Sequence, residues 1–341
     1  MPAFMARRTV AVIGAGVSGL FCARALQDEG IDVRLFDKGR SAGGRLATRR
    51  AGTFAFDHGA QFFTVRDARL QRLVEGWLAS GLVARWQPRL VEIALDERGR
   101  TATPVPQEHP RYVAVPGMSA LARHLAEGLD LRANTRVTRL EREGSQWRLW
   151  GEDALAPGPA LDLGTYDRVA AALPPVQAAP LLEGAPALAL LAAQVQLDPC
   201  IAVLAAFEQP LEPGFDAARV QGGPLSWAAR NSSKPGRGLQ ETWVLHAAAA
   251  WSLAQLEDPP EKQGPALLQA FAQVADRALP EPCLLQVHRW RYAQAPASPP
   301  GLACLFDAAA GLGACGDWCG TPRVEGAALS GLALADRLAH G

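Results

Sequence analysis

The chain has 341 residues, of which 49% are hydrophobic and 20% charged, a composition that excludes a disordered or fibrous protein. Thirty-four basic residues balance 34 acidic ones, so no net charge favours nucleic acid or an anionic membrane as a partner. A chain of this length is expected to form two packed domains rather than one small core.

A glycine-rich motif near the N-terminus predicts a dinucleotide site. An apolar run precedes Gly14, Gly16 and Gly19, a helical pattern follows, and a second apolar run ends at Asp37. In such a strand–helix–strand unit the glycines allow a tight turn, the approach of a pyrophosphate and close helix packing, while the acid accepts from a ribose. The helix N-terminus offers its unpaired N–H groups to the phosphates.

The residues after Asp37 favour FAD. Gly43, Gly44 and Arg45 follow the second strand, where a loop would lie over the pyrophosphate and the Arg45 guanidinium could pair with a phosphate. Here the sequence resembles flavoproteins with an N-terminal FAD-binding unit followed by a Gly-Gly-Arg motif, a class that includes amine oxidases and phytoene desaturases. The resemblance implies FAD rather than NAD.

A second glycine motif lies near the other end of the chain. A strand that ends at Gly316 and Asp317 precedes a helix opened by Glu325 and Gly326. Asp317 would accept hydrogen bonds from the ribityl or pyrophosphate side of FAD, and the helix would open beneath the isoalloxazine. One FAD stretched across a sheet requires two such motifs.

Hydrophobic periodicity predicts further helices and strands along the chain. The predicted helices are residues 67–80, 119–128 and 262–279, and residues 98–110 are predicted as a proline-rich loop. The predicted strands are residues 53–57, 83–94 (a pair), 130–137, 146–150, 165–173, 194–207, 225–230 and 241–247.

The predicted fold class is α/β (α+β), with a Rossmann-like FAD-binding domain and a smaller, mainly antiparallel β-sheet substrate domain. The FAD-binding domain is assigned to residues 1–60, 112–175 and 301–341, and the substrate domain to residues 61–111 and 176–300. This is the amine-oxidase and p-hydroxybenzoate-hydroxylase-like architecture of the flavoproteins that the sequence resembles.

Several stretches between the two glycine motifs have polar and aromatic residues suited to a substrate. In the segment 57–64 small residues let backbone pass a flat ring, Gln61 offers an amide, and Phe62 and Phe63 offer ring faces, although a core strand with a polar turn explains them equally well. The basic loop 230–237 suits either a diphosphate or a solvated turn. His246 lies on an apolar strand, where core histidines are common.

Five stretches resemble one family in particular, the bacterial renalases. They are Asp57–Thr64, Trp227–Arg237, Thr242–Ala247, His288–Ala293 and the segment from Cys315 through Ala327. The resemblance implies an FAD oxidase that returns dihydronicotinamide isomers of NAD(P)H to NAD(P)+ and passes the electrons to oxygen as hydrogen peroxide. The family has Tyr at the position of Phe62, so a hydrogen bond from that site is lost here.

The motifs and the resemblance together give the predicted site residues. Those for FAD are Gly14, Gly16, Ser18, Gly19, Asp37, Lys38, Gly44, Arg45, Gln61, Phe62, Val137, Asp317, Val324, Glu325 and Gly326. Those for the substrate are Phe62, Phe63, Thr64, Arg66, Asn231 and His246. No catalytic acid or base is predicted, because aromatisation of the ring drives hydride transfer from a dihydropyridine, and Gln61 and Phe62 are the residues expected nearest the reaction.

Two other functions stay open. An amine oxidase or desaturase on the same fold usually places a lysine near flavin N5, and the only candidates outside the FAD motif, Lys234 and Lys262, lie on stretches not expected at the flavin. The second is a flavoprotein that binds a nucleotide without turnover.

The cysteines and apolar runs bear on the compartment. Six cysteines show neither a CxxC pair nor zinc-ligand spacing, which predicts free thiols and no metal. Residues 1–8 are too few for a signal peptide, and the longest apolar run, 185–195, is shorter than the roughly 20 residues that cross a bilayer. We expect a cytoplasmic protein without membrane or nucleic-acid partners, as a monomer or weak dimer.

Overall fold

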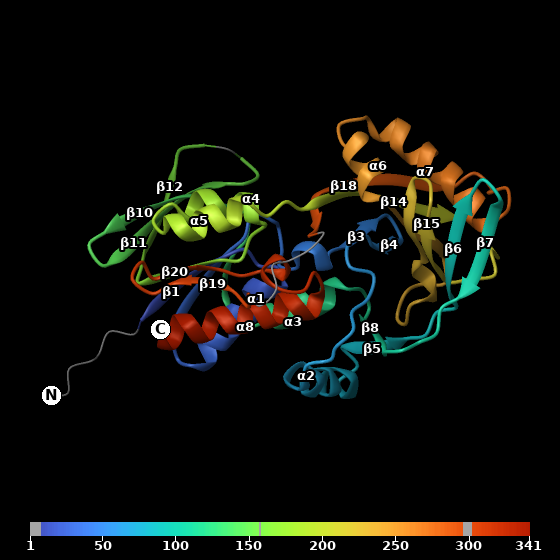
Figure 1. Cartoon of the computed structure of the whole chain (residues 1–341). Helices are drawn as coiled ribbons and strands as arrows, with labels where there is room; N and C mark the ends of the chain where they lie inside the picture. The colour runs from blue at the N-terminus through green and yellow to red at the C-terminus, as the bar shows by residue number, and fades with distance from the viewer. Residues whose placement is uncertain (1–7, 157, 296–301) are drawn as a thin grey trace. The chain divides into compact units, whose positions relative to one another are not determined.

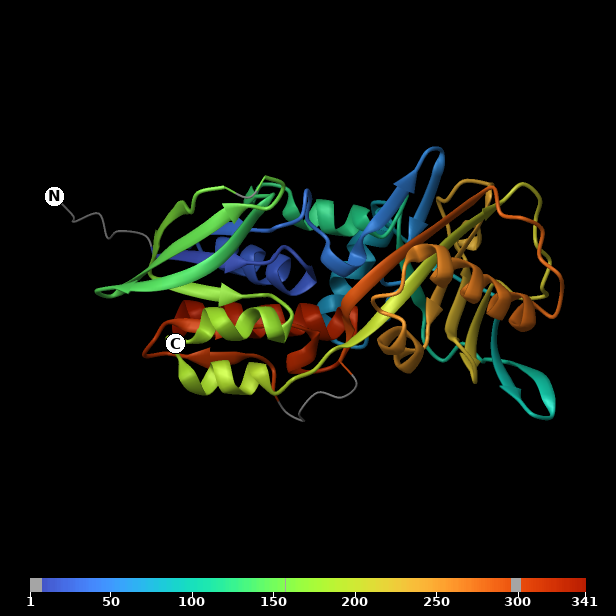
Figure 2. The ribbon, with the colours of Figure 1, turned by 90° about the horizontal axis from the view of Figure 1, so that it is seen from above.

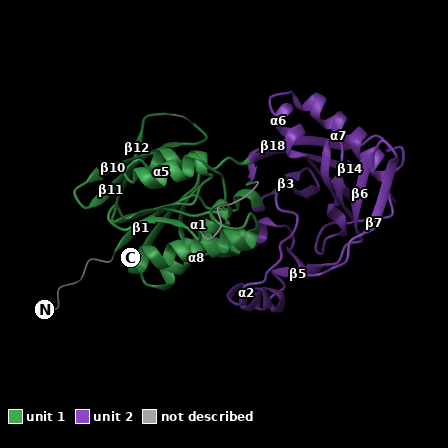
Figure 3. Ribbon diagram, in the orientation of Figure 1, with its two compact units in different colours: residues 1–45, 122–197, 295–341 green, residues 46–121, 198–294 purple. Residues whose placement is uncertain are grey.

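The computed structural model describes residues 8–156, 158–295 and 302–341, and they form two compact units (Figures 1 and 3). Unit 1 comprises Met1–Arg45, Ala122–Leu197 and Ala295–Gly341. Unit 2 comprises Leu46–Leu121 and Asp198–Gln294. Residues 1–7, where the absence of a signal peptide was predicted, lie outside the described residues.

Unit 1 is built on a six-stranded sheet in the order β19-β20-β13-β1-β2-β9. Its strands are β1 (Thr9–Ile13), β2 (Asp32–Phe36), β9 (Asp130–Arg132), β13 (Arg168–Ala171), β19 (Leu305–Asp307) and β20 (Leu312–Ala314). All neighbours are parallel except β19 and β20. The central strands are buried on both faces, which is why β1 and β13 have apolar residues almost throughout.

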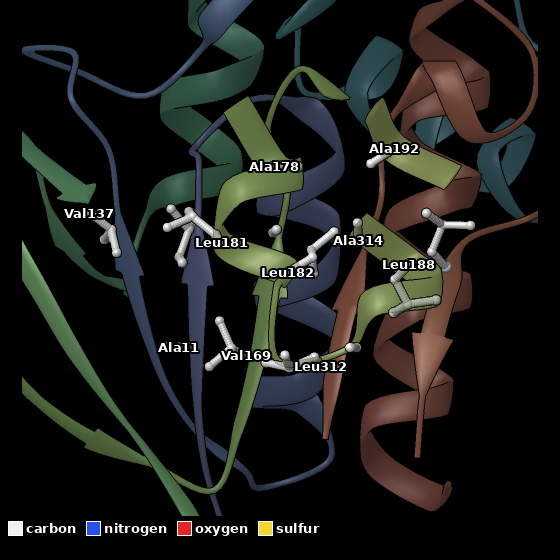
Figure 4. Close-up of a cluster of buried hydrophobic side chains, with 14 of the residues drawn as sticks. Ala11, Val137, Val169, Ala178, Leu181, Leu182, Leu188, Ala192, Leu312 and Ala314 are labelled. Carbon is white, nitrogen blue, oxygen red and sulfur yellow. The ribbon is translucent and has the colours of Figure 1, made fainter. Parts of the chain in front are cut away.

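Helices and a smaller sheet cover the six-stranded sheet. The helices of unit 1 are α1 (Val17–Asp28), α4 (Pro175–Ala178), α5 (Pro186–Ala193) and α8 (Val324–His340), and α3 (Ser119–Ala126) spans the boundary between the units. The antiparallel sheet is β10 (Thr135–Glu143), β11 (Gln146–Asp153) and β12 (Leu161–Tyr166). In the core of Figure 4, Leu181, Leu182 and Leu188 around α4 and α5 pack with Val169 and Leu312 of the sheet.

Unit 2 contains a seven-stranded sheet in the order β18-β14-β17-β16-β15-β6-β7, antiparallel except between β15 and β6. Its strands are β6 (Leu90–Asp96), β7 (Gly99–Pro104), β14 (Asp198–Phe207), β15 (Ala217–Gln221), β16 (Leu225–Arg230), β17 (Glu241–Ala247) and β18 (Leu284–Gln294). The helices are α2 (Ala68–Ala79), α6 (Ala249–Ala254) and α7 (Pro260–Ala275). Helix α7, orange in Figure 2, lies along this sheet. Its residues Leu267, Phe271 and Val274 belong to the buried cluster that the sheet strands share.

Two hairpin-like pairs complete unit 2. Strand β3 (Thr48–Ala51) pairs with β4 (Phe54–Asp57), and β5 (Val83–Trp86) pairs with β8 (Arg111–Ala114). The segment that contains Phe63 joins the second pair, since Phe63 and Tyr112 exchange backbone hydrogen bonds of 2.9 and 2.8 Å.

The predicted fold class is confirmed, with a largely parallel Rossmann-like sheet in one unit and a mainly antiparallel sheet in the other. One local prediction is wrong. Residues 99–104 of the expected loop form β7, an edge strand, and edges tolerate the proline that ends it. The apolar run 185–195 contributes α5, whose leucines cover the sheet of unit 1.

The units also divide the chain differently from the domains expected from sequence. Residues 46–60 and 112–121 lie in unit 2, because Asp57 and Met118 are hydrogen-bonded within it. Residues 176–197 lie in unit 1, because α5 packs there. The expected boundary at residue 300 lies outside the described residues.

All six cysteines are free thiols, as predicted. In the described part of the chain, no helix combines the length and apolarity needed to span a membrane.

Helices α1 and α8 cross at a glycine. A Cβ on Gly331 would overlap the Ser18 carbonyl oxygen and lie 3.1 Å from the Cys22 nitrogen. We expect Gly331→Ala to lower the free energy of unfolding by about 2 kcal/mol, because backbone must separate to admit the methyl group. In contrast, the methyl group of Gly76→Ala on α2 would meet nothing within 4 Å. This variant is expected to raise the free energy of unfolding by up to about 1 kcal/mol, because alanine has the higher helix propensity. Urea unfolding followed by circular dichroism measures both; equal effects would contradict the packing argument.

Candidate functional site

The three glycines of the N-terminal motif have different roles in unit 1. Gly14 has φ +105°, and its Cβ would lie 3.0 Å from the Ala172 carbonyl carbon. A Cβ on Gly19 would overlap the Gly14 carbonyl oxygen. Gly16 has φ −75°, and a Cβ there would meet no atom within 4 Å. The fold itself therefore requires the first and third glycines, whereas the space beside Gly16 suits an approaching ligand.

Asp37 holds this loop from the end of β2. One carboxylate oxygen accepts from the Ala15 N–H at 2.6 Å and the other from the Gly39 N–H at 2.6 Å. Each oxygen keeps a lone pair for a ribose hydroxyl. Helix α1 begins next to this carboxylate with no side-chain cap, so its first N–H groups suit a phosphate.

Sequence reasoning missed Asn134, which lies between β9 and β10. Its backbone is left-handed, with φ 54°, and its N–H donates to the Gly39 carbonyl at 2.9 Å. The side-chain oxygen is buried without a hydrogen-bond partner in the described part of the chain. Val137, the residue predicted to line the adenine, is buried three positions later. A lone asparagine between two predicted strands gives no sequence signal beyond its tolerance of positive φ.

The second glycine motif meets the first through an ion pair. Arg45 donates to both oxygens of Asp317, at 2.9 and 2.7 Å, although the two residues are 272 positions apart. The 3-10 helix η4 (Asp317–Cys319) is fixed by Trp318, whose indole N–H donates to the Leu173 carbonyl at 2.9 Å. The predicted association of the two chain ends is therefore present in unit 1.

The helix that follows also begins as expected. Val324 and Glu325 open α8, which has no side-chain cap, and a Cβ on Gly326 would lie 2.9 Å from the Thr321 carbonyl carbon. Ser18 is buried beneath α8 at Gly331. The positions of Lys38 and Gly44, at the end of β2 and in the 3-10 helix η1 (Gly44–Leu46), complete the predicted FAD set in unit 1.

Unit 2 is organised around Asp57, whose carboxylate is fully buried. It accepts from the Thr48 hydroxyl at 2.8 Å and the Met118 N–H at 2.9 Å, and it pairs with Lys234 at 3.4 Å and with Arg237. Burial alone would raise the pKa of Asp57, but the two cations keep it below its ordinary value. Asp57 is therefore ionised throughout the neutral range.

Lys234 links this carboxylate to Gln61. Its ammonium group donates to the Gln61 side-chain oxygen at 3.1 Å and to the Asn231 side-chain oxygen at 3.3 Å, with the lysine only 2% exposed. Burial lowers the pKa of Lys234 to about 8. The Gln61 amide nitrogen donates to the carbonyls of Asp57 and, at 3.1 Å, of Gly59. The orientation of the Gln61 amide is thus fixed at both ends.

Neither interpretation of the basic loop agrees with these contacts. Arg230 pairs with Glu241, with 2.8 Å between its Nε and the carboxylate, while Lys234 and Arg237 pair with Asp57. Lys234 and Arg237 are buried rather than solvated. The loop stabilises unit 2, and its three cations are not available as a diphosphate site.

Phe62, a predicted substrate residue, lies in an aromatic group with Trp86 and Trp227, beside Arg111. Phe62 lies with ring centroids 5.8 Å from Trp86 and 5.9 Å from Trp227, and the Arg111 guanidinium lies 5.7 Å from the Phe62 centroid. Phe63 is buried, whereas Thr64 is partly exposed and Arg66 is exposed.

His246 and Asn231, the other predicted substrate residues, use their polar atoms within unit 2. The His246 Nε2–H donates to the His58 carbonyl at 3.0 Å, and the Trp290 indole N–H donates to the same oxygen at 3.0 Å. The Asn231 amide donates to the Ala55 carbonyl at 2.9 Å and accepts from the Asp57 N–H. These contacts match the core-histidine interpretation of His246.

Comparison with known proteins identifies the family. Residues 12–77 match the model of the NAD(P)-binding Rossmann-like domain, and residues 80–339 match that of the flavin containing amine oxidoreductases. The chain belongs to the flavin-containing amine oxidoreductase family. FAD is accordingly its cofactor, as predicted, and the glycine turns, Asp37 and the orphaned Asn134 oxygen fit such a group.

Solved structures share the fold of this amine oxidoreductase. A "Putative protoporphyrinogen oxidase" from Exiguobacterium sp. 255-15 is similar with a TM-score of 0.78 and 15% identity, covering 98% of this chain and 99% of that one. Putrescine oxidase bound to putrescine is similar with a TM-score of 0.70 and 15% identity, covering 97% and 98%. An oxidoreductase from Methanosarcina mazei has a TM-score of 0.70 and 15% identity, covering 96% and 100%.

In this family member FAD supplies an acceptor for two electrons and a proton at its N5 atom. The groups of unit 1 that would bind and orient it are the loop at Gly16, the carboxylate of Asp37 and the Arg45–Asp317 pair. Within the described residues no group of histidine, cysteine and acidic side chains could hold a metal ion.

The glycine loop separates cofactor binding from folding. We expect Gly16→Ala to fold with the unfolding temperature of the FAD-free wild type but to lose FAD, because its methyl occupies only the ligand's space. We expect Gly14→Ala to lower the unfolding temperature of the FAD-free protein as well, since φ +105° strains any other residue. The ratio of absorbance at the flavin band to that of protein, with thermal unfolding, measures both. A fully flavinylated Gly16→Ala protein would contradict the placement of the pyrophosphate.

The buried histidines predict acid sensitivity. Burial lowers the pKa of His58 to about 3 and that of His246 to about 4, while unfolded histidine titrates near ~6.5. Between these values the unfolded chain binds more protons, so stability falls as the pH falls from about 6.5 to about 4.5, by roughly 2 kcal/mol for each histidine.

Urea unfolding of variants at pH 7 and pH 4.5 isolates this contribution. His246→Gln keeps an N–H donor for the His58 carbonyl and is expected to lose less stability on acidification than the wild type. His109 is exposed, so His109→Gln is the control, and it should lose as much stability on acidification as the wild type. Identical behaviour of all three proteins would contradict the assignment.

Proposed function

We propose that this flavin-containing amine oxidoreductase oxidises the 2- and 6-dihydro isomers of NAD(P)H to NAD(P)+. A hydride leaves the dihydropyridine ring for flavin N5, and O2 then takes two electrons and two protons to become H2O2. The proposal is supported by the resemblance to bacterial renalases in five stretches of the chain.

One structural observation carries the proposal. Phe62, a predicted substrate residue, offers an aromatic face beside Arg111, and the carboxylate closest in sequence to Gln61, Asp57, is already held by Lys234 and Arg237. A substrate that needed a carboxylate base could not use Asp57, because its charge is already paired. A dihydropyridine does not need one, because aromatisation of its ring drives hydride loss.

The chain's own residues would then act by positioning. The Gln61 amide is fixed by Lys234, Gly59 and the Asp57 carbonyl, and Phe62 offers a ring face for stacking on the planar nicotinamide. Correct placement of reacting atoms accounts for several kcal/mol of barrier lowering in such reactions.

An amine oxidase is the second candidate, and Lys234 favours it. The ammonium group contacts Gln61, a residue predicted for FAD, although from sequence the lysine was expected on a stretch away from the flavin. A buried lysine with a pKa of about 8 can exchange protons near neutral pH. A third candidate is a flavoprotein without turnover.

Anaerobic mixing tests the three candidates. We expect the oxidised, FAD-loaded protein to lose its flavin absorbance within seconds on mixing with 6-dihydro-NAD or 6-dihydro-NADP, and to regain it with formation of H2O2 when oxygen is admitted. Putrescine is expected to leave the flavin oxidised. Reduction by putrescine alone overturns the proposal in favour of an amine oxidase, and no reduction by either favours the protein without turnover.

Lys234→Met adds a second criterion. If no proton transfer at Lys234 assists the reaction, the rate of flavin reduction by a dihydro isomer should stay within about tenfold of the wild type, whereas loss of a general acid or base costs roughly 100-fold or more. Arg237 still pairs with Asp57 in this variant. Stopped-flow absorbance on folded, FAD-loaded protein measures the rate.

A further inference from the structure

Arg111 is a buried cation that folding does not pair. The residue begins β8 and is 6% exposed. No hydrogen bond or ion pair joins its guanidinium to another residue in the described part of the chain, whereas Arg230 and Arg237 in the same unit are paired with carboxylates. A guanidinium has five N–H donors and stays charged, and none of these donors has a protein acceptor among the described residues.

The surroundings of Arg111 are aromatic. Its guanidinium lies 5.7 Å from the centroid of Phe62, whose ring contacts Trp86 and Trp227. The Trp86 indole N–H is satisfied by the Ser233 hydroxyl at 3.1 Å. The Trp227 indole N–H is buried and has no hydrogen-bond partner in the described residues. Two kinds of donor beside Phe62 therefore lack acceptors.

The nearby charge is of the same sign. Burial lowers the pKa of Arg111, and the positive charge of Arg219 lowers it further. Arg219 on β15 lies directly opposite Trp227 on β16, so the two side chains share one face of the sheet. Arg219 is exposed, and it forms no ion pair among the described residues. The positive charges of Arg111 and Arg219 and the unsatisfied Trp227 N–H together favour an acceptor that carries negative charge.

We propose that Arg111 and Trp227 form a binding subsite for an oxyanion of the substrate, with Arg219 adding charge. The inference rests on the proposed function, in which the oxyanion is a phosphate of the dihydronicotinamide nucleotide. The proposed subsite, rather than the basic loop 230–237, would then recognise the anion. The cations of that loop are already paired with carboxylates of unit 2.

Stacking on Phe62 is the structural alternative for Arg111. Cation–π contact is worth about 0.5–2 kcal/mol and uses none of the five N–H donors of the guanidinium. Stacking also leaves the Trp227 N–H without a partner. An oxyanion accounts for both observations.

Calorimetric titration with inorganic pyrophosphate and, separately, with succinate tests the subsite. The protein is loaded with FAD, so that the probe cannot occupy the cofactor's own phosphate site. We expect the wild type to bind one or both probes, and Arg111→Met to weaken binding roughly tenfold or more, as expected for loss of a charged hydrogen bond. Arg111→Lys keeps the charge without the planar fork and should weaken binding partially.

Arg98→Met is the control for net charge, because Arg98 is exposed on the β6–β7 hairpin of the same unit. It should bind the probes as the wild type does. If Arg111→Met does not fold, the partial loss of probe affinity in Arg111→Lys tests the subsite instead. The stronger probe shows whether phosphate or carboxylate is preferred.

The inference is overturned if the wild type binds neither probe, or if the Arg111 variants bind as tightly as the wild type. Probe binding does not depend on turnover, so the subsite and the proposed function are tested by separate measurements. If binding depends on Arg111 but dihydro isomers do not reduce the flavin, the subsite stands and the proposed function fails. If the isomers are oxidised with the same KM in the wild type and Arg111→Met, the proposed function stands and the subsite fails.

Discussion

The arrangement of unit 2 depends on one buried charge, the carboxylate of Asp57. A buried carboxylate costs several kcal/mol unless it is paired, and two cations, Lys234 and Arg237, approach it. Two positive charges against one negative leave an excess, which neutral oxygens of Gln61 and Asn231 moderate by accepting from the lysine. The electrostatics of folding therefore fix the direction of the Gln61 amide. A residue predicted to contact the cofactor or substrate is oriented by a pair formed for stability.

Local signals made the cofactor half of the molecule predictable. The glycine spacing, the acid at Asp37 and the Arg45 motif all lie within one strand–helix–strand unit, where each residue's role follows from its neighbours in sequence. Arg45 and Asp317 each belong to a recognisable motif and were each expected to contact FAD, but their contact with one another was not predicted. Asn134 has no such motif, and its unpartnered oxygen became visible only once β9 and β10 were placed.

The substrate half was less predictable, because its contacts join distant segments. Lys234 lies among serine, glycine and proline, which reads as a surface turn, yet its partner Asp57 is 177 positions away. Arg111 follows a proline-rich stretch, part of which forms β7. Nothing in the sequence around Lys234 or Arg111 indicates that Lys234 is paired with a carboxylate and Arg111 is not. That difference depends on which carboxylates the tertiary fold brings near.

The same distinction separates structural from functional residues. Where folding satisfies every polar atom of a side chain, as for Asn231 and Glu241, stability alone explains the residue. Where burial leaves an acceptor, a donor or a charge unmet, the free energy cost persists unless a ligand removes it. Asn134 in unit 1 and Arg111 with Trp227 in unit 2 meet this condition. The unmet groups have opposite hydrogen-bonding character, an acceptor in the first case and donors in the second. The unpaired oxygen in unit 1 therefore suits a ligand with N–H or O–H groups, such as adenosine. The unpaired donors in unit 2 suit an oxyanion.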